Sequence, residues 1–442
     1  MKKSLIFLFL FFLVVFFLLY LFFLSSPSVI EESSQPIEEK DEVVGDLLGV
    51  DNIITLKPPE NFGASEIGAP ESTQRDDRVY IDVPEDTSEG SLGSSTTPEE
   101  QVQRLTRLFV GPTAGYRIDQ MDDGSWVVRV VEQGRGDRYI IQTSPYSINL
   151  VAGGEFTRVL DAYIFSNDTS LVLYESSGNE SLIKSAFVPF APTDGNNKIQ
   201  LFEDNIRVAT NNENLLFFLK EIDDKTVGLV VNTSNPEDTK IIWESYFSNW
   251  LPRWGRNSFI TISTPISKLT KGYVYLLDPS EKGLFSRLAD IPSGGSLFID
   301  TSSGFFVLYE ASLEEIVGKT SITEQTRNVS VQIPSTLPEK CDGFNGVFIC
   351  AVPTIVPART LSGYETVFPD SWYQGDIFLQ DSLIQVDVVT GGKKLLFSSD
   401  QEDIQLLSGG RTFDIIHPRI SEDGSLFFFV DKRDMALWVL QL

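Results

Sequence analysis

Histidine and cysteine are scarce in this chain of 442 residues, which has one histidine, His417, and two cysteines, Cys341 and Cys350. This excludes mechanisms that need several histidines, and no cysteine spacing fits a zinc site. The sequence also lacks H-E-x-x-H, G-x-S-x-G and the phosphate-binding G-x-x-x-x-G-K-[ST]. We therefore predict no catalytic residues, no metal site and no cofactor, and we interpret His417 as structural.

Basic residues are also few. The chain has 35 Lys and Arg against 62 Asp and Glu, a formal net charge of -27. Phosphate recognition needs clustered Lys and Arg, and no such run occurs, so we predict no nucleic-acid partner. The acidic excess is concentrated in residues 25–103, where 19 acidic residues stand against 4 basic ones.

One long apolar run is present, SLIFLFLFFLVVFFLLYLFFL at residues 4–24, directly after Lys2 and Lys3. Its 21 residues match the length of a membrane-spanning helix. We predict an uncleaved single-pass anchor at residues 1–24, with the N-terminus in the cytoplasm and the rest outside the cell membrane. The alternative is a cleaved secretory signal, which would also export the protein.

Residues 25–103 are rich in Ser, Pro, Glu and Gly, and we predict a flexible acidic linker. Two islands within it, residues 43–56 and 78–83, are apolar enough for a short helix or strand. We expect transient local structure there, with a docking motif as the alternative.

From residue 115 onward the sequence repeats a pattern seven times. In each repeat, an apolar stretch leads into a pair of residues typical of a tight turn, and a second apolar stretch follows. The intervals between consecutive pairs are 44, 44, 43, 49, 42 and 78 residues, and the first five match the period of four-stranded propeller blades. The pairs are Asp123-Gly124, Asn167-Asp168, Asn211-Asn212, Trp254-Gly255, Ser303-Gly304, Asn345-Gly346 and Asp423-Gly424. We predict an all-β fold, a seven-bladed β-propeller over residues 104–442, with eight blades as the alternative.

The last repeat ends at Leu442 with three strand-like segments, and a fourth, RLTRLFV at residues 104–110, precedes the first repeat. We predict that this segment completes the seventh blade and closes the ring, which would remove exposed strand edges.

The 78-residue interval indicates an insertion at about residues 354–375. It is the most aromatic loop of the chain, and loops on a rigid scaffold often bind partners. We name Tyr364, Phe368, Trp372 and Tyr373 as a candidate binding loop. The alternative is a loop that folds back to cover a blade edge.

The segment CDGFNGVFIC places both cysteines in one hairpin, because an Asn345-Gly346 turn pairs residue 341 with residue 350. The α-carbons of such a pair lie within the range of a disulfide. An oxidising compartment favours the bond, so we predict a Cys341–Cys350 disulfide over two free buried thiols.

The repeats resemble the WD-repeat-like and TolB-like propellers of exported bacterial proteins. More specifically, SNWLPRWG, KGYVYLLD, LPEKC with CAVP, and FPDSWYQGDIF resemble segments of uncharacterised membrane-anchored proteins from small-genome bacterial candidate phyla. We expect a non-enzymatic scaffold that binds a protein or cell-envelope component. The alternative is an exported hydrolase or lyase that acts on glycan or peptide through carboxylates in the propeller channel.

Overall fold

The structure is a computed structural model that describes residues 78–80 and 105–442, except for 144, 177–182, 193–198, 205, 255–258, 280–284, 292–296, 301–304, 312–317, 325–328 and 399–411. The chain divides into two units, Met1–Phe62 and Gly63–Leu442, and every described residue belongs to the second. The predicted anchor and most of the predicted linker lie outside the described residues. Among the residues that are described, no helix is long and apolar enough to cross a membrane.

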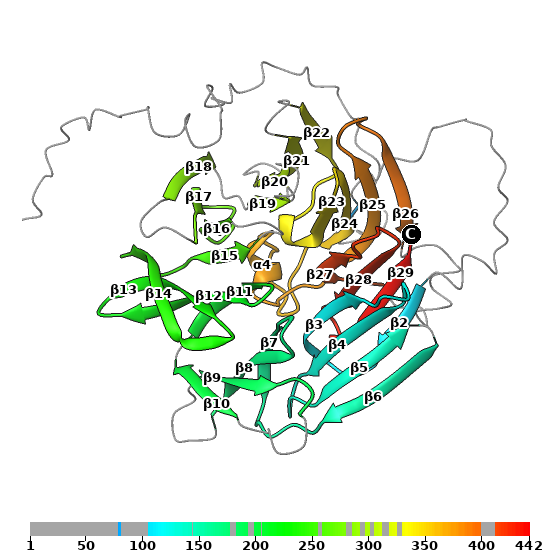
Figure 1. The fold of residues 1–442 in the computed structure, drawn as a ribbon. Coiled ribbons are helices and arrows are strands. Elements are labelled where there is room, and N and C mark those ends of the chain that lie inside the picture. Colours follow the sequence, from blue (N-terminus) through cyan, green and yellow to red (C-terminus); the bar gives the residue numbers. More distant parts are fainter. Residues whose placement is uncertain are drawn as a thin grey trace, which may run out of the picture. The chain divides into compact units, whose positions relative to one another are not determined.

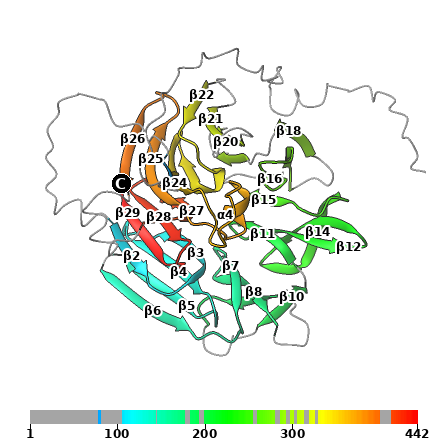
Figure 2. The same cartoon turned by 180° about the vertical axis from the view of Figure 1, so that it is seen from behind.

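Seven antiparallel sheets follow one another along the chain, and Figures 1 and 2 show them as blades around a common centre. Blade 1 contains β3 (Thr113–Gln120), β4 (Trp126–Glu132), β5 (Arg138–Thr143) and β6 (Tyr146–Ala152). Blade 2 contains β7 (Val159–Ile164), β8 (Thr169–Glu175), β9 (Ile183–Pro189) and β10 (Gln200–Asp204). Blade 3 contains β11 (Ile206–Asn212), β12 (Leu215–Ile222), β13 (Lys225–Asn232) and β14 (Asn235–Ser245).

Blades 4 to 6 have the same plan. Blade 4 contains β15 (Leu251–Trp254), β16 (Ile260–Ser263), β17 (Gly272–Leu277) and β18 (Phe285–Ile291). Blade 5 contains β19 (Leu297–Asp300), β20 (Phe305–Glu310), β21 (Lys319–Glu324) and β22 (Val329–Ile333). A 3-10 turn, η1 (Pro338–Lys340), leads into blade 6, which contains β23 (Cys341–Phe344), β24 (Val347–Pro357), β25 (Gln380–Asp387) and β26 (Lys393–Ser398).

Blade 7 joins the two ends of the propeller. Its strands are β27 (Ile415–Ile420), β28 (Leu426–Asp431), β29 (Leu437–Gln441) and β2 (Leu105–Phe109), which precedes blade 1 in the sequence. Leu105 of β2 lies opposite Leu440 of β29. The predicted closure is therefore confirmed, and so is the seven-bladed, four-stranded fold.

The turn pairs of the sequence mark one position in the blade, the connection between the first and second strands. In blade 6, Asn345 (φ 52°) and Gly346 (φ 80°) both have the left-handed backbone that a two-residue hairpin turn requires. The third pair is offset, because Asn211 and Asn212 still belong to β11 and the turn follows at Glu213. Gly255, Ser303 and Gly304 lie outside the described residues.

Antiparallel strands give the ring two distinct faces. We call the face with the first-to-second and third-to-fourth strand connections the turn face. The opposite face, which we call the insertion face, carries the second-to-third connections and the links between blades. The first strands surround the centre, since β3 contacts β7, β11 contacts β15, and β23 contacts β27.

The long interval in the sequence is an insertion between β24 and β25, as predicted, and it lies on the insertion face. It covers residues 358–379, because β24 continues to Pro357 before the chain leaves the sheet, and it contains the short helix α4 (Asp370–Tyr373). At this end of β24, Ile355, Val356 and Pro357 pair with β1 (Arg78–Tyr80). β1 therefore places part of the island at residues 78–83 against blade 6.

Candidate functional site

The insertion lies over the ring and packs on several blades. Its buried side chains contact Ile266 from blade 4, Tyr309 from blade 5 and Ile416 from blade 7. In addition, the backbone N–H of Lys268 in blade 4 donates to Asp370 Oδ2 at 3.0 Å. In both Figure 1 and Figure 2, α4 projects onto the centre of the ring.

The four residues of the candidate binding loop divide into two buried and two exposed side chains. Phe368 is 1% exposed and Trp372 is 4% exposed, and both pack into the apolar cluster beneath the insertion. Tyr364 and Tyr373, in contrast, are 75% and 38% exposed. Of the four, only the two tyrosines present side chains that a partner can reach.

Trp372 attaches the insertion to polar groups of blade 7. Its indole Nε1–H lies 3.0 Å from both carboxylate oxygens of Asp414. The ammonium of Lys432 lies 3.9 Å from the centroid of the ring and donates to the carbonyl oxygen of Trp372. Burial lowers the pKa of Lys432 to about 8, although Asp414 opposes this effect.

Beneath Trp372 lies a fully buried ion cluster. Lys340 Nζ is 2.7 Å from Asp381 Oδ2 and 2.7 Å from Asp414 Oδ1, and it donates to the carbonyl of Ile415 at 3.0 Å. Burial alone would lower the pKa of Lys340, but the two carboxylates outweigh it and the pKa is raised. The cluster therefore joins η1, β25 and the start of blade 7 below the insertion.

Sequence reasoning missed this cluster, because 41 and 74 residues separate Lys340 from its two partners. A signal was nevertheless present in the motifs that carry the family resemblance. LPEKC contains Lys340, and FPDSWYQGDIF contains Trp372. Those motifs mark the attachment of the insertion.

Exposed apolar side chains also lie at several places on the insertion face. Between β16 and β17, Leu269 is 76% exposed, and it follows the residue that bonds to Asp370. Leu361, Tyr364 and Tyr373 are exposed on the insertion itself. Tyr246 and Phe247, in the link that leads into blade 4, are exposed on the same face. We call these six residues, Tyr246, Phe247, Leu269, Leu361, Tyr364 and Tyr373, the apolar patch.

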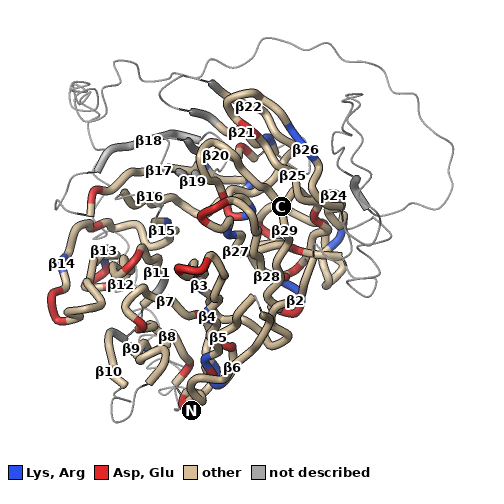
Figure 3. The backbone as a smooth tube through the Cα atoms, turned by 45° about the vertical axis from the view of Figure 1, so that its right-hand side comes forward, with Lys and Arg blue, Asp and Glu red and all other residues tan. Residues whose placement is uncertain are grey.

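Charged and polar side chains of two first strands, β15 and β27, lie toward the centre of the ring. Arg253 Nη2 of β15 lies 3.5 Å from Glu339 Oε2 of η1. Because blade 5 stands between blade 4 and η1 in the ring, this contact reaches past blade 5 at its inner end. Figure 3 shows basic and acidic segments interspersed along the described backbone.

His417 of β27 lies on this inner wall and has a left-handed backbone, with φ 50°. Its side chain is exposed to solvent, yet burial lowers its pKa to about 4, with the guanidinium groups of Arg419 and Arg253 acting in the same direction. A side chain that is open to solvent and yet surrounded by protein is typical of a residue that lines a channel, and His417 has both properties. The imidazole is therefore neutral at pH 7.

On β7, Asp161 has a pKa that its surroundings raise. Burial raises its pKa to about 6, although hydrogen bonds from Tyr163 Oη–H (2.7 Å) and the Ala162 N–H (2.9 Å) oppose the shift. Within the described part of the chain, no group of three or more His, Cys, Asp or Glu side chains is placed to hold a metal ion.

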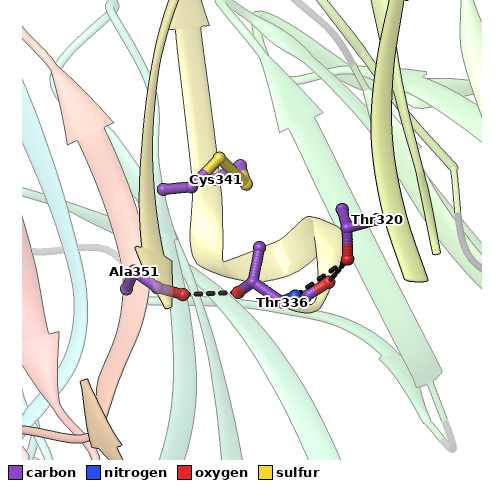
Figure 4. Close-up of a disulfide and its surroundings, with 5 residues drawn as sticks. Thr320, Thr336, Cys341 and Ala351 are labelled. Carbon is purple, nitrogen blue, oxygen red and sulfur yellow. Dashed lines mark hydrogen bonds between the residues drawn. A yellow bond between two sulfur atoms is a disulfide. The ribbon is translucent and has the colours of Figure 1, made fainter. Parts of the chain in front are cut away.

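The predicted disulfide is present in the hairpin of blade 6. Cys341 and Cys350 lie directly opposite each other, with α-carbons 4.1 Å apart, and their sulfurs are bonded. Figure 4 shows the link from blade 5 beside it, where Thr336 bonds to Thr320 of β21 and to the carbonyl of Ala351. The disulfide therefore reinforces the hairpin next to the blade 5–blade 6 junction.

No protein-family model and no curated protein matches this chain. Similar solved structures include an oligogalacturonate lyase in complex with manganese, 10% identical, covering 77% of this chain and 90% of that one, with a TM-score of 0.46. The Pan2 WD40 domain of Neurospora crassa is 9% identical over 76% of this chain and 95% of that one, with a TM-score of 0.42.

A TolB-like protein of Agrobacterium tumefaciens is 11% identical, over 51% of this chain and 84% of that one, with a TM-score of 0.36. The three proteins thus include an enzyme and a WD40 domain. From its own sheets and their closure, the chain is a seven-bladed β-propeller.

Proposed function

We propose that the protein is a membrane-anchored, extracytoplasmic binding scaffold, and that its insertion face binds a protein of the cell envelope. The observation that supports this best is the apolar patch on that face. Its six exposed side chains come from two parts of the ring, the links of blade 4 and the insertion of blade 6. Exposed aromatic and aliphatic side chains on a rigid support are typical of protein-binding surfaces.

The buried contacts beneath the insertion support the same proposal, because they hold in place the part of the patch that the insertion carries. Trp372 belongs to one apolar cluster with residues of blades 4, 5 and 7. Its indole N–H donates to Asp414, which in turn pairs with Lys340. A surface that is already ordered loses less conformational entropy on binding.

The test uses substitutions of exposed residues, because deletion of the insertion would remove Trp372 and uncover the Lys340 cluster. The full-length chain carrying Leu269→Ser, Leu361→Ser and Tyr364→Ser is compared with the parent. A control carries Ile148→Ser, Leu150→Ser and Leu201→Ser, which are 41%, 58% and 68% exposed on the outer strands β6 and β10. Both variants replace three exposed apolar side chains and leave the core intact.

Partners are captured from envelope extract, purified, and titrated against the three proteins. We expect the patch variant to bind at least about tenfold more weakly, since loss of one or two interface anchors costs a few kcal/mol. The control should bind like the parent. Equal affinity of the parent and the patch variant for every purified partner would contradict the proposal.

A further inference from the structure

The inner wall of blade 7 contains an irregularity that ordinary propeller packing does not require. Ile416 pairs with Val430, and Arg419 pairs with Phe428. The chain therefore advances three residues along β27 while it advances only two along β28. One extra residue is therefore inserted at His417 and Pro418, and His417 takes up its left-handed backbone there. Such bulges redirect side chains, and strained backbone is concentrated at functional sites.

The neighbouring blade braces this bulge. Tyr116 of β3 donates its hydroxyl to the carbonyl oxygen of His417 at 2.5 Å. Beyond the bulge, the N–H of Ile420 donates to Asp342 Oδ2 at 2.7 Å. Backbone contacts on both sides therefore fix β27, and the side chains of His417 and Arg419 are left exposed on the inner strand.

The chemistry of His417 and Arg419 depends on which charged groups near them already have partners. Arg253, the nearby second arginine, already has a partner in Glu339. Asp342 is buried and accepts the Ile420 N–H. Within the described part of the chain, the Arg419 guanidinium has no hydrogen bond or ion pair. The site thus offers the planar donor fork of Arg419, which is the donor that carboxylates and phosphates prefer, and beside it one N–H of a neutral imidazole.

We infer that the channel contains an oxyanion site, in which Arg419 and His417 bind a carboxylate or phosphate group of a small molecule. The site is separate from the apolar patch and goes beyond the proposed binding of a protein partner.

The site is tested by isothermal titration calorimetry of the full-length chain with sodium phosphate and, separately, with sodium citrate, at constant ionic strength and pH 7. Arg419→Gln removes the donor fork. His417→Asn keeps a residue that tolerates left-handed backbone but removes the imidazole. Arg359→Gln, an exposed arginine on the insertion, is the matched control for loss of one positive charge.

We expect saturable binding of at least one anion, weakened about tenfold or more in R419Q and unchanged in R359Q. H417N should weaken anion binding less than R419Q does. Preference for phosphate would assign a phosphorylated ligand, and preference for citrate a carboxylated one. Thermal melts without anion verify folding, and if R419Q unfolds, Arg419→Lys keeps the charge without the fork and should still weaken binding.

The inference is overturned by either of two results. The first is the absence of saturable binding of both anions up to about 10 mM, a concentration that detects even weak sites. The second is equal affinity of the parent and the folded Arg419 variant. Neither result would affect the apolar patch, whose test uses different residues and a different ligand.

Discussion

Asp161 retains its proton to a higher pH than an exposed aspartate does. Its folded-state pKa is raised to about 6 by burial, whereas an unfolded chain has the ordinary value near 3.9. The folded state therefore binds the proton more tightly. The stabilisation that results is complete below the unfolded pKa and is lost as pH rises through about 6.

We predict that Asp161→Asn removes a part of the pH dependence of stability. Between pH 4 and 7, the parent should lose about 1–3 kcal/mol of unfolding free energy through this residue, and the variant should not. Asn is nearly isosteric and can still accept the hydrogen bond from Tyr163. Urea denaturation at several pH values measures the slope.

Asp387 provides a control of opposite sign. Hydrogen bonds from the Thr390 and Val389 N–H groups lower its pKa, so its stabilisation is present above the unfolded pKa and is lost on acidification. Asp387→Asn should lower stability at pH 7 and leave the decline between pH 4 and 7 in place. A parent-like slope in Asp161→Asn would contradict the assignment.

Single residues were the hardest part of the site to predict from sequence. The aromatic content of the insertion was evident, but sequence alone does not distinguish Trp372, which is buried, from Tyr364, which is exposed. The difference arises from Asp414, 42 residues away, which accepts the indole N–H. Contacts across such separations depend on blade register, which no local pattern specifies.

At the scale of elements, the hairpin of β23 and β24 was predictable to the residue, because an Asn-Gly turn fixes its register. The end of β24 was not. The predicted insertion began at residue 354, but the strand runs on to Pro357, where β1 supplies a partner from before the ring. Strand length here depends on a distant segment.

The same hairpin gives a prediction about the disulfide. Replacing Cys341 and Cys350 together by Ala should lower the unfolding free energy by about 2–3 kcal/mol, the value expected for a crosslink that closes a loop of roughly ten residues. Denaturation of the parent with and without reductant should show the same difference. Two free thiols in the unreduced protein would show that the bond does not form.

At the scale of the whole molecule, the repeat period predicted the ring, and the missing fourth strand of the last repeat predicted its closure. Both predictions rely on a general requirement, which is that a β-array must protect its edges. The placement of the insertion over the ring's centre was beyond sequence reasoning. It depends on contacts with blades 4, 5 and 7 that exist only after closure.

Closure predicts that the propeller unfolds as one unit. Leu105, Leu108 and Phe109 of β2 are buried, and each contributes about 1.5–3 kcal/mol, so their sum is comparable to the whole stability of a typical domain. Deleting residues 437–442, which removes the partner strand β29, should abolish cooperative melting of all blades.

Calorimetry and far-UV circular dichroism measure this loss. Val79→Pro is the control, because it disturbs only the three-residue pairing of β1 with β24. It should melt close to the parent. A deletion variant that melted like the parent would show that the blades are stable without closure.

The entry of the chain through β2 has a mechanical consequence. β2 is the outermost strand of blade 7, and the chain that precedes it arrives at Leu105, opposite the C-terminal end of β29. Tension on that chain would meet the short β1 pairing first and then β2. A pull directed across the strands would peel β2 from β29 one residue pair at a time, starting at Leu105. The strand that closes the ring is thus also the one at which a pull would open it.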